Sequence, residues 1–268
     1  MSRELTFPSF DGTELYAKLE VPTNPKALTV IVHGLAEHQG RYDYLAARLA
    51  AQAYAVFRFD HRGHGRSKGE RVYYSDFTEI VDDVNAAFEV ATGELPGLPV
   101  YLIGHSMGGY ASALFGTKYP DKAAGIVFSG ALTRYNNQVM GPIPLPGDPH
   151  TYVPNELGAG VCSDPAVIEA YVNDPYVEKQ ISLGLCNSFA GGLEYLKANA
   201  AAFVAPTLIL HGGLDALVSN LDSREFFGEI GSEDKSLRVY AGLMHEIFNE
   251  IRKDEVIGDT LAWLNAHV

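Results

Sequence analysis

Short apolar runs alternate with longer amphipathic segments along most of the chain. Between the apolar runs, residues 42–53 and 77–91 place apolar side chains at helical spacing. The apolar runs themselves are rich in Val, Ile, Leu and Phe without polar alternation, and they cover 29–32, 55–59, 100–103, 125–128 and 207–210. That composition is typical of parallel strands that are buried on both faces. The alternation predicts an α/β fold with one mostly parallel sheet.

The two ends of the chain extend this pattern. Residues 5–10 and 14–21 flank Asp11-Gly12, a dipeptide that favours tight hairpins, so we expect the sheet to begin with an antiparallel pair. Residues 237–240 predict a further strand, and residues 254–267 predict the last helix. The complete pattern is a sheet of eight strands flanked by helices.

One long stretch after the sixth expected strand interrupts the alternation. The stretch carries many Gly and Asn residues and seven prolines, so we expect no long helices or strands in its first half. The prolines are Pro142, Pro144, Pro146, Pro149, Pro154, Pro165 and Pro175. An excursion of this length in a compact domain usually serves a site. We therefore expect a catalytic domain built from residues 1–132 and 201–268, with residues 133–200 inserted as a cap or lid.

Composition and charge restrict the partners. With 47% hydrophobic and 20% charged residues, the chain has ample material for a core. The net charge of −13 argues against nucleic acid or an anionic membrane as the main partner, since both attract basic surfaces. No signal peptide or membrane-spanning run is recognisable, so we expect a cytoplasmic protein with a small-molecule substrate and with Cys162 and Cys186 as thiols.

The strongest chemical signal follows the apolar run 100–103. Residues 104–108 read G-H-S-M-G, and a segment with helical character follows them. This is the G-x-S-x-G pattern in its strand, turn and helix context, where glycines allow a turn tight enough to expose the serine hydroxyl. We therefore predict that Ser106 is a nucleophile.

A serine hydroxyl needs a base oriented by a carboxylate. Asp215 follows the run 207–210 and His245 follows the run 237–240, so the order is Ser, Asp, His, which is the order of the α/β-hydrolases. The main rival for the acid role is Asp222, which we expect instead to cap a helix near Ser223. The other histidines lack a comparable context, and a turn around His61 and His64 argues against a metal pair.

Two backbone N–H groups are needed to stabilise the oxyanion of an acyl-transfer reaction. The residue after the nucleophile, Met107, supplies one. We assign the other to Leu35, in the loop after the first central strand, where Gly34 lets the backbone approach closely.

With these residues assigned, the chain resembles the monoacylglycerol lipases of the α/β-hydrolase superfamily. Residues 33–42, HGLAEHQGRY, resemble the family segment H-G-x-x-E-H-x-x-R-Y. Residues 60–69, DHRGHGRSKG, resemble its D-H-R-G-H-G-x-S-x-G loop, and residues 242–250 resemble the segment around the catalytic histidine of bacterial members. These motifs are more specific than G-x-S-x-G and cover both ends of the expected catalytic domain. Related lysophospholipases and carboxylesterases share much of the pattern.

The resemblance implies hydrolysis of a monoacylglycerol to glycerol and a fatty acid, without a cofactor. It also implies a polar glycerol pocket to which Glu37 and Arg41 would contribute. The alternative is that Glu37, His38 and Arg41 form a structural hydrogen-bond cluster that holds the oxyanion loop. Two functions remain as alternatives: a general carboxylesterase or lysophospholipase with the same triad, and a ligand-binding homologue without turnover.

The cap is where the chain departs from the family. Membrane-docking members carry an apolar helix there, whereas residues 138–154 read QVMGPIPLPGDPHTYVP and exclude a long amphipathic helix. We therefore expect at most weak peripheral membrane contact through the cap. The sequence leaves the acyl-chain preference and the oligomeric state open.

Overall fold

The computed structural model describes all residues from Met1 to Val268. The strands are β1 (Ser2–Pro8), β2 (Glu14–Glu20), β3 (Ala27–Val32), β4 (Tyr54–Phe59), β5 (Val100–His105), β6 (Gly125–Ser129), β7 (Tyr152–Pro154), β8 (Gln180–Ser182), β9 (Thr207–Gly212) and β10 (Lys235–Tyr240). The α-helices are α1 (Asp43–Ala50), α2 (Phe77–Glu94), α3 (Met107–Lys118), α4 (Pro165–Asn173), α5 (Leu183–Ala198), α6 (Asn220–Glu229) and α7 (Lys253–Ala266). Short 3₁₀ helices cover Gln39–Tyr42, Leu157–Gly160 and Ala200–Ala202.

Eight strands form one sheet in the order β1-β2-β4-β3-β5-β6-β9-β10. The pairs β1–β2 and β2–β4 are antiparallel, and all later pairs are parallel. The parallel strands therefore end at a common edge, which is where open α/β sheets bind their ligands. The predicted mostly parallel sheet of eight strands is confirmed.

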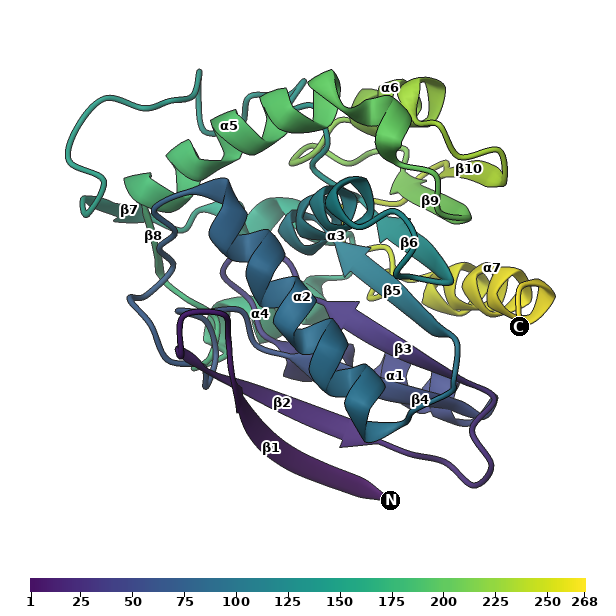
Figure 1. Cartoon of the computed structure of the whole chain (residues 1–268). Coiled ribbons are helices and arrows are strands. Elements are labelled where there is room, and N and C mark those ends of the chain that lie inside the picture. Colours follow the sequence, from purple (N-terminus) through teal and green to yellow (C-terminus); the bar gives the residue numbers. More distant parts are fainter.

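Helices cover both faces of the sheet, which explains why the central strands lack polar alternation. In β3, Leu28, Val30 and Val32 belong to a core shared with α2 and α3, whereas Ala27 and Ile31 belong to a second core shared with α1 and α7. Figure 1 shows the resulting three layers, with α2 and α3 on one face of the sheet and α1 and α7 on the other. Every residue of β3, β4 and β5 is buried.

The element boundaries differ from the predicted ones by a few residues. Strand β1 ends at Pro8 rather than at residue 10, because residues 9–13 form a longer turn in which Ser9 N–H donates to Thr13 O at 2.8 Å. Helix α1 is shorter than predicted mainly because it ends at Ala50, and residues 51–53 form a turn in which Ala53 has φ 62°. Both cysteines are free, as predicted. None of the helices combines the length and the apolar character that a membrane span requires.

The chain between β6 and β9 forms the inserted segment, and residues 133–200 are called the insertion below. Its proline-rich first half contains only the short strand β7 and a 3₁₀ turn, as predicted. Strands β7 and β8 pair with each other and not with the main sheet. Helix α5 behaves differently, since its Leu185, Phe189 and Leu196 are buried in the core that α2 and α3 share. The insertion is thus anchored through α5, which crosses above α2 and α3 in Figure 1.

Candidate active site

Ser106 lies on a sharp turn between β5 and α3. Its backbone has φ 53° and ψ −116°, a conformation that L-residues rarely adopt and that costs of the order of 1–3 kcal/mol. Glycines make the turn possible: a Cβ on Gly104 would lie 2.5 Å from Gly108 O, and a Cβ on Gly108 would lie 2.0 Å from Val32 O. The turn leaves the serine partly exposed while its neighbours are buried.

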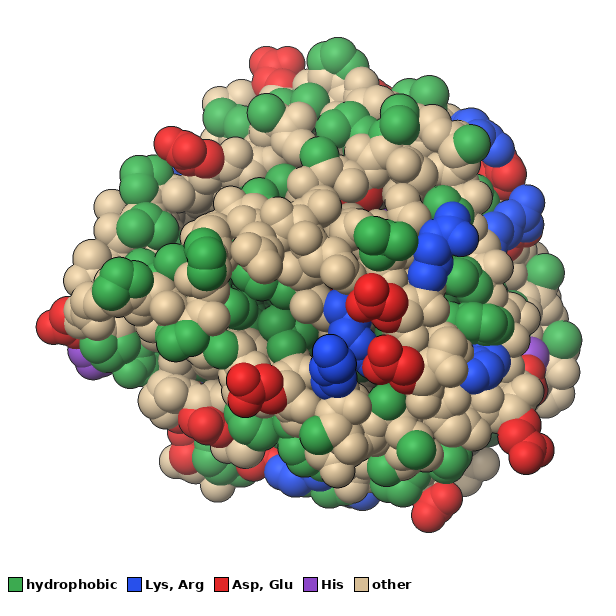
Figure 2. All heavy atoms as spheres, turned by 90° about the horizontal axis from the view of Figure 1, so that it is seen from above, with side chains coloured by type: hydrophobic (Ala, Val, Ile, Leu, Met, Phe, Trp, Pro, Cys, Tyr) green, Lys and Arg blue, Asp and Glu red, His purple; other side chains and the backbone are tan.

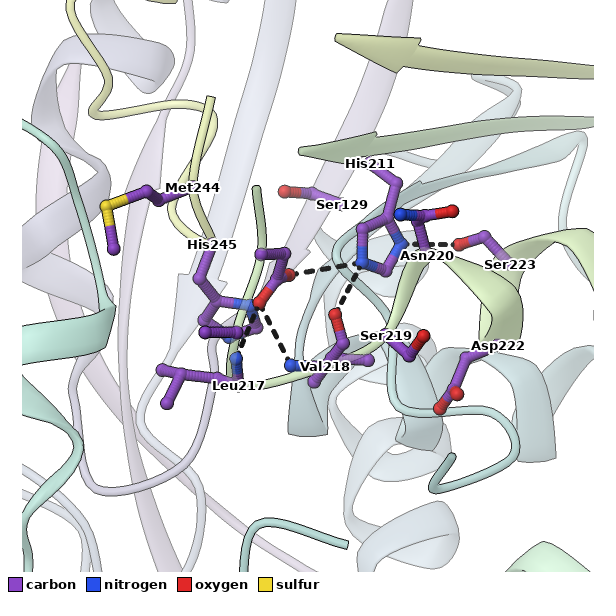
Figure 3. A network of polar contacts seen from close by, with 12 residues as sticks. Ser129, His211, Leu217, Val218, Ser219, Asn220, Asp222, Ser223, Met244 and His245 are labelled. Carbon is purple, nitrogen blue, oxygen red and sulfur yellow. Dashed lines mark hydrogen bonds and ion pairs between the residues drawn. The ribbon is translucent and has the colours of Figure 1, made fainter. Parts of the chain in front are cut away.

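Asp215 and His245 are joined directly. His245 Nδ1 lies 2.7 Å from Asp215 Oδ2, and both side chains are buried. The other carboxylate oxygen, Oδ1, accepts the backbone N–H groups of Leu217 and Val218, each at 2.9 Å. These contacts hold the carboxylate in one orientation behind the imidazole, and Figure 3 shows how Leu217, Val218 and His245 surround this point.

The pair shifts the pKa values of both groups. Burial by itself would raise the pKa of Asp215, but the charge of His245 and the hydrogen bonds from histidines hold it below its usual range. Burial would lower the pKa of His245, yet the Asp215 carboxylate outweighs burial and raises it above 6.5. An ionised acid therefore lies beside an imidazole whose protonated form is stabilised, which is what a general base needs in order to take up a proton.

The rival residues have other tasks. Asp222 does not cap α6, so that prediction was wrong: Ser219 is the N-cap, and Asp222 lies in the first turn of the helix. The Asp222 carboxylate instead accepts the backbone N–H groups at the start of the insertion, at 2.8–3.1 Å, from Arg134, Tyr135 and Asn136. Asp222 therefore ties the insertion to α6.

The histidines near the nucleophile are also accounted for. The His105 ring lies 4.6 Å from the His245 ring, centroid to centroid, and burial lowers the pKa of His105 to about 3. His61 Nε2 lies 3.1 Å from His33 O, and His64 Nδ1 lies 2.9 Å from Arg62 O. These buried rings bind backbone carbonyls in the loops beneath the site.

The loop after β3 brings the backbone of Leu35 to the nucleophile. A Cβ on Gly34 would lie 2.9 Å from Glu37 Oε1 and 3.3 Å from the Cβ of Ser106, so a side chain here would force its neighbours to shift. The N–H groups of Leu35 and Met107 donate to no protein group, although Gly34 N–H is bound at 2.6 Å by Glu37 Oε1. Two free N–H groups beside a serine are what an oxyanion requires.

Glu37 and Arg41 form a buried cluster behind this loop. Glu37 accepts the Gly34 N–H and the Tyr42 hydroxyl, each at 2.6 Å, and Arg41 at 2.7 Å. Arg41 also binds Glu246 through both terminal nitrogens, at 2.6 and 2.7 Å. Burial favours the neutral acid, but the charge of Arg41 outweighs burial and lowers the pKa of Glu37 to about 2. The hydrogen bonds of Glu37 therefore support the structural alternative for this residue, although Glu37 also lines the cavity.

A narrow cavity of about 50 Å³ adjoins the serine and joins two kinds of surface. Its polar wall includes Ser106, Glu37, His245 and Glu246, and its apolar wall comes largely from the insertion. A second cavity of about 690 Å³ lies beyond it, and the two share Val139, Met140, Leu157 and Leu217. Figure 2, which views the molecule from above, shows a hollow with hydrophobic side chains near the middle of this face.

Sequence reasoning missed two residues of the site. Glu246, next to His245, lines the cavity and pairs with Arg41. Its signal was a carboxylate adjacent to the candidate base. His211, near the end of β9, lies 3.1 Å from Asp215 Oδ2 through its Nε2. Its signal was the i, i+4 spacing to the candidate acid.

Comparisons with known proteins identify the family of the chain. A family model described as Serine aminopeptidase, S33 matches residues 23–252. The monoacylglycerol lipase of Mycolicibacterium smegmatis is 35% identical over 277 aligned positions, which cover 99% of this chain and 98% of that protein. The monoglyceride lipase of Homo sapiens is 32% identical, with 90% of this chain and 82% of that protein covered. The crystal structure of the Paleococcus ferrophilus monoacylglycerol lipase has a TM-score of 0.82 at 30% identity and covers 95% of this chain and 99% of its own.

These matches include every segment of the site. Residues 23–252 contain the loop after β3, the turn at Ser106 and the loops that carry Asp215 and His245. The relatives also match over most of their own length, so the likeness is not confined to one motif. The chain therefore belongs to the family that the serine aminopeptidase S33 model describes and, within it, is a member of the monoacylglycerol lipases of the α/β-hydrolase fold.

Proposed function

We propose that this protein hydrolyses the ester bond of monoacylglycerols, releasing glycerol and a fatty acid, with Ser106, Asp215 and His245 as catalytic residues. The single observation that carries the proposal is the 2.7 Å contact between Asp215 and His245 at the wall of the cavity that also contains Ser106. Similarity to a monoacylglycerol lipase over nearly the whole chain supports the choice of substrate.

The reaction proceeds in two steps. Ser106 Oγ attacks the ester carbonyl while His245 Nε2 takes the hydroxyl proton, and Asp215 stabilises the imidazolium that forms. The N–H groups of Leu35 and Met107 bind the oxyanion of the tetrahedral intermediate. His245 then protonates the departing glycerol oxygen, which leaves an acyl-enzyme. A water molecule activated by the same histidine releases the fatty acid and restores the serine.

The two cavities support an acyl chain as the apolar part of the substrate. Of the residues that line the outer cavity, all but Leu217 come from the insertion, and most are hydrophobic. A hydrocarbon chain gains free energy in proportion to the apolar area that it buries. We therefore extend the proposal to residues 133–200 as the cap that binds the acyl chain, with residues 1–132 and 201–268 as the catalytic domain.

The test is a set of initial rates on monoacylglycerols of increasing chain length, with p-nitrophenyl butyrate and a lysophospholipid as comparison substrates. We expect the highest kcat/KM on medium or long monoacylglycerols. Turnover of only the small activated ester would instead indicate a general esterase, and a preference for the lysophospholipid would indicate a phospholipase.

Ser106→Ala is the control for the mechanism, since it keeps the fold and removes the attacking oxygen. Loss of the nucleophile of such a triad lowers kcat by about 10⁶-fold, and a variant that kept more than about a thousandth of the activity would contradict the assignment. A fluorophosphonate probe distinguishes the non-catalytic alternative, because a ligand-binding homologue would leave Ser106 unlabelled.

A further inference from the structure

The proposed catalytic acid has a second histidine partner that the triad does not use. Asp215 Oδ2 lies 2.7 Å from His245 Nδ1 and 3.1 Å from His211 Nε2. The His211 side chain is fully buried, and His211 is the penultimate residue of β9. Figure 3 shows the ring between Ser223 and Val218, with His245 at a distance from it.

The hydrogen bonds of His211 define its tautomer. His211 Nε2 lies 3.0 Å from the carbonyl oxygen of Val218, which only accepts, so Nε2 carries the proton. Nδ1 lies 2.7 Å from Ser223 Oγ and accepts the hydroxyl proton of that serine. The Nε2–H therefore points to Val218 O, and Nε2 also lies 3.1 Å from Asp215 Oδ2. Ser223 fixes the ring from α6.

We propose that His211 is a positioning residue for the esterase reaction. It donates a second hydrogen bond to Asp215 Oδ2, the carboxylate oxygen that faces His245. This inference rests on the proposed function, because it assumes that Asp215 is the catalytic acid. The Leu217 and Val218 N–H groups restrain Oδ1, and His211 restrains Oδ2 in the same way. The carboxylate is held at both oxygens, so its lone pair stays directed at His245 Nδ1–H.

The second donor also sets the strength of the acid–base pair. A neutral N–H that donates to Oδ2 spreads part of the carboxylate charge away from His245. Without this donor, Asp215 would attract the imidazolium of His245 more strongly and raise the pKa of the base. If His211 only tied the loop 213–218 to α6, its replacement would lower the stability of the fold. It would not lower kcat at constant KM, and it would not change the pKa of His245.

The test compares two substitutions at one position. His211→Leu removes the donor, whereas His211→Gln places an amide N–H where the imidazole Nε2–H lies. Rates on p-nitrophenyl butyrate are measured across pH, so that the result does not depend on whether monoacylglycerols are the substrate. For His211→Leu we expect about a 10-fold or larger fall in kcat, a KM within about twofold of wild type and an acid limb displaced to higher pH, as expected for loss of a hydrogen bond to a charged group.

His211→Gln should restore most of the kcat and the wild-type acid limb. Equal losses in both variants, or an unchanged acid limb in His211→Leu, would overturn the proposal. Measured thermal unfolding of both variants identifies any loss that only reflects a smaller folded fraction.

A measurement on the wild-type protein keeps the inference testable if His211→Leu does not fold. In ¹⁵N-histidine NMR spectra we expect His211 with Nε2 protonated and Nδ1 unprotonated; the reverse tautomer would overturn the proposal.

Ser223→Ala removes the donor to Nδ1 and should lower kcat by about threefold, the effect of losing one modest hydrogen bond. A variant that changed the tautomer but left kcat and the acid limb unchanged would refute a positioning role. Activity that survives Ser106→Ala would instead refute the proposed function and leave the tautomer result intact.

Discussion

The catalytic edge of the sheet and the insertion differ in how they use polar and apolar side chains. At the catalytic edge, the loops after β3, β5, β9 and β10 carry Leu35, Ser106, Asp215 and His245. The carboxylates there are hydrogen-bonded to His245 or to backbone N–H groups. The insertion presents mainly apolar side chains to two cavities, and much of its first half lacks helices and strands. The catalytic edge orients polar groups, and the insertion encloses the apolar cavities.

The difference follows from what each region must do. Acyl transfer needs donors and acceptors held in one geometry, and buried strands followed by short turns supply that rigidity. An acyl chain has no polar groups to orient, so an apolar enclosure suffices. Changes at the catalytic edge should therefore affect every substrate alike, while changes in the insertion should affect substrates according to chain length.

The largest expected effect comes from Asp215→Asn. The amide cannot stabilise the imidazolium as a carboxylate does, and we expect kcat to fall by about 10⁴-fold for every ester, as in other enzymes with this triad. Asp222→Asn is the matched control, because the Asp222 carboxylate accepts only from the backbone of residues 134–136 and from the Asn136 side chain. It should lower the melting temperature and keep kcat within a few-fold; near-normal turnover by Asp215→Asn would move the acid role elsewhere.

A smaller effect is expected for Glu37→Gln. Glu37 holds the Gly34 N–H at 2.6 Å, and loosening the oxyanion loop should lower kcat by about 10- to 100-fold, less than loss of an oxyanion donor costs. The factor should be the same for glycerol esters and for p-nitrophenyl butyrate. Glu246→Gln is the control. It removes the other carboxylate that pairs with Arg41 and leaves the Glu37 hydrogen bond to the oxyanion loop in place. A loss confined to glycerol esters would assign Glu37 to the glycerol pocket instead.

Met140→Ala should change specificity rather than catalysis. Met140 lines both cavities, so its truncation widens the passage between them. We expect kcat/KM for long-chain relative to short-chain monoacylglycerols to rise by about 3- to 10-fold, a typical value for small volume changes in a hydrophobic pocket. Val153→Ala, which lines only the outer cavity, should shift this ratio less. A uniform change at all chain lengths would contradict the division of roles.

The smallest expected effect is the pH dependence. The base must be neutral to accept the Ser106 proton, so activity should fall as pH drops through the pKa of His245. Because Asp215 raises that pKa, the acid limb should lie above the ordinary value of 6.5. The relative rates on different chain lengths should stay constant across the limb, because the walls shared by the two cavities carry no titratable group. A profile that is flat from about pH 5 to about pH 9 would exclude His245 as the base.

Sequence reasoning predicted the catalytic edge more completely than the contacts behind it. Buried parallel strands are recognisable because a strand covered on both faces must be apolar throughout, as in β3 and β5. Ser106 and Asp215 were identifiable because each follows such a strand, whereas His245 follows β10, which is only partly buried. The role of Asp222 was not identifiable, because its partners at residues 134–136 lie far away in sequence. Helix α5 likewise belongs to the main core although its sequence lies within the insertion.

The sequence by itself determined the α/β class and predicted candidate site residues after strands, because periodicity and turn chemistry are local properties. The tertiary structure alone decided that His211 joins Asp215, that Glu246 shares Arg41 with Glu37, and that the insertion opens a cavity beside Ser106. Those contacts depend on the packing of segments that are distant along the chain or on the direction of a side chain. Neither is set by the residues next to it in sequence.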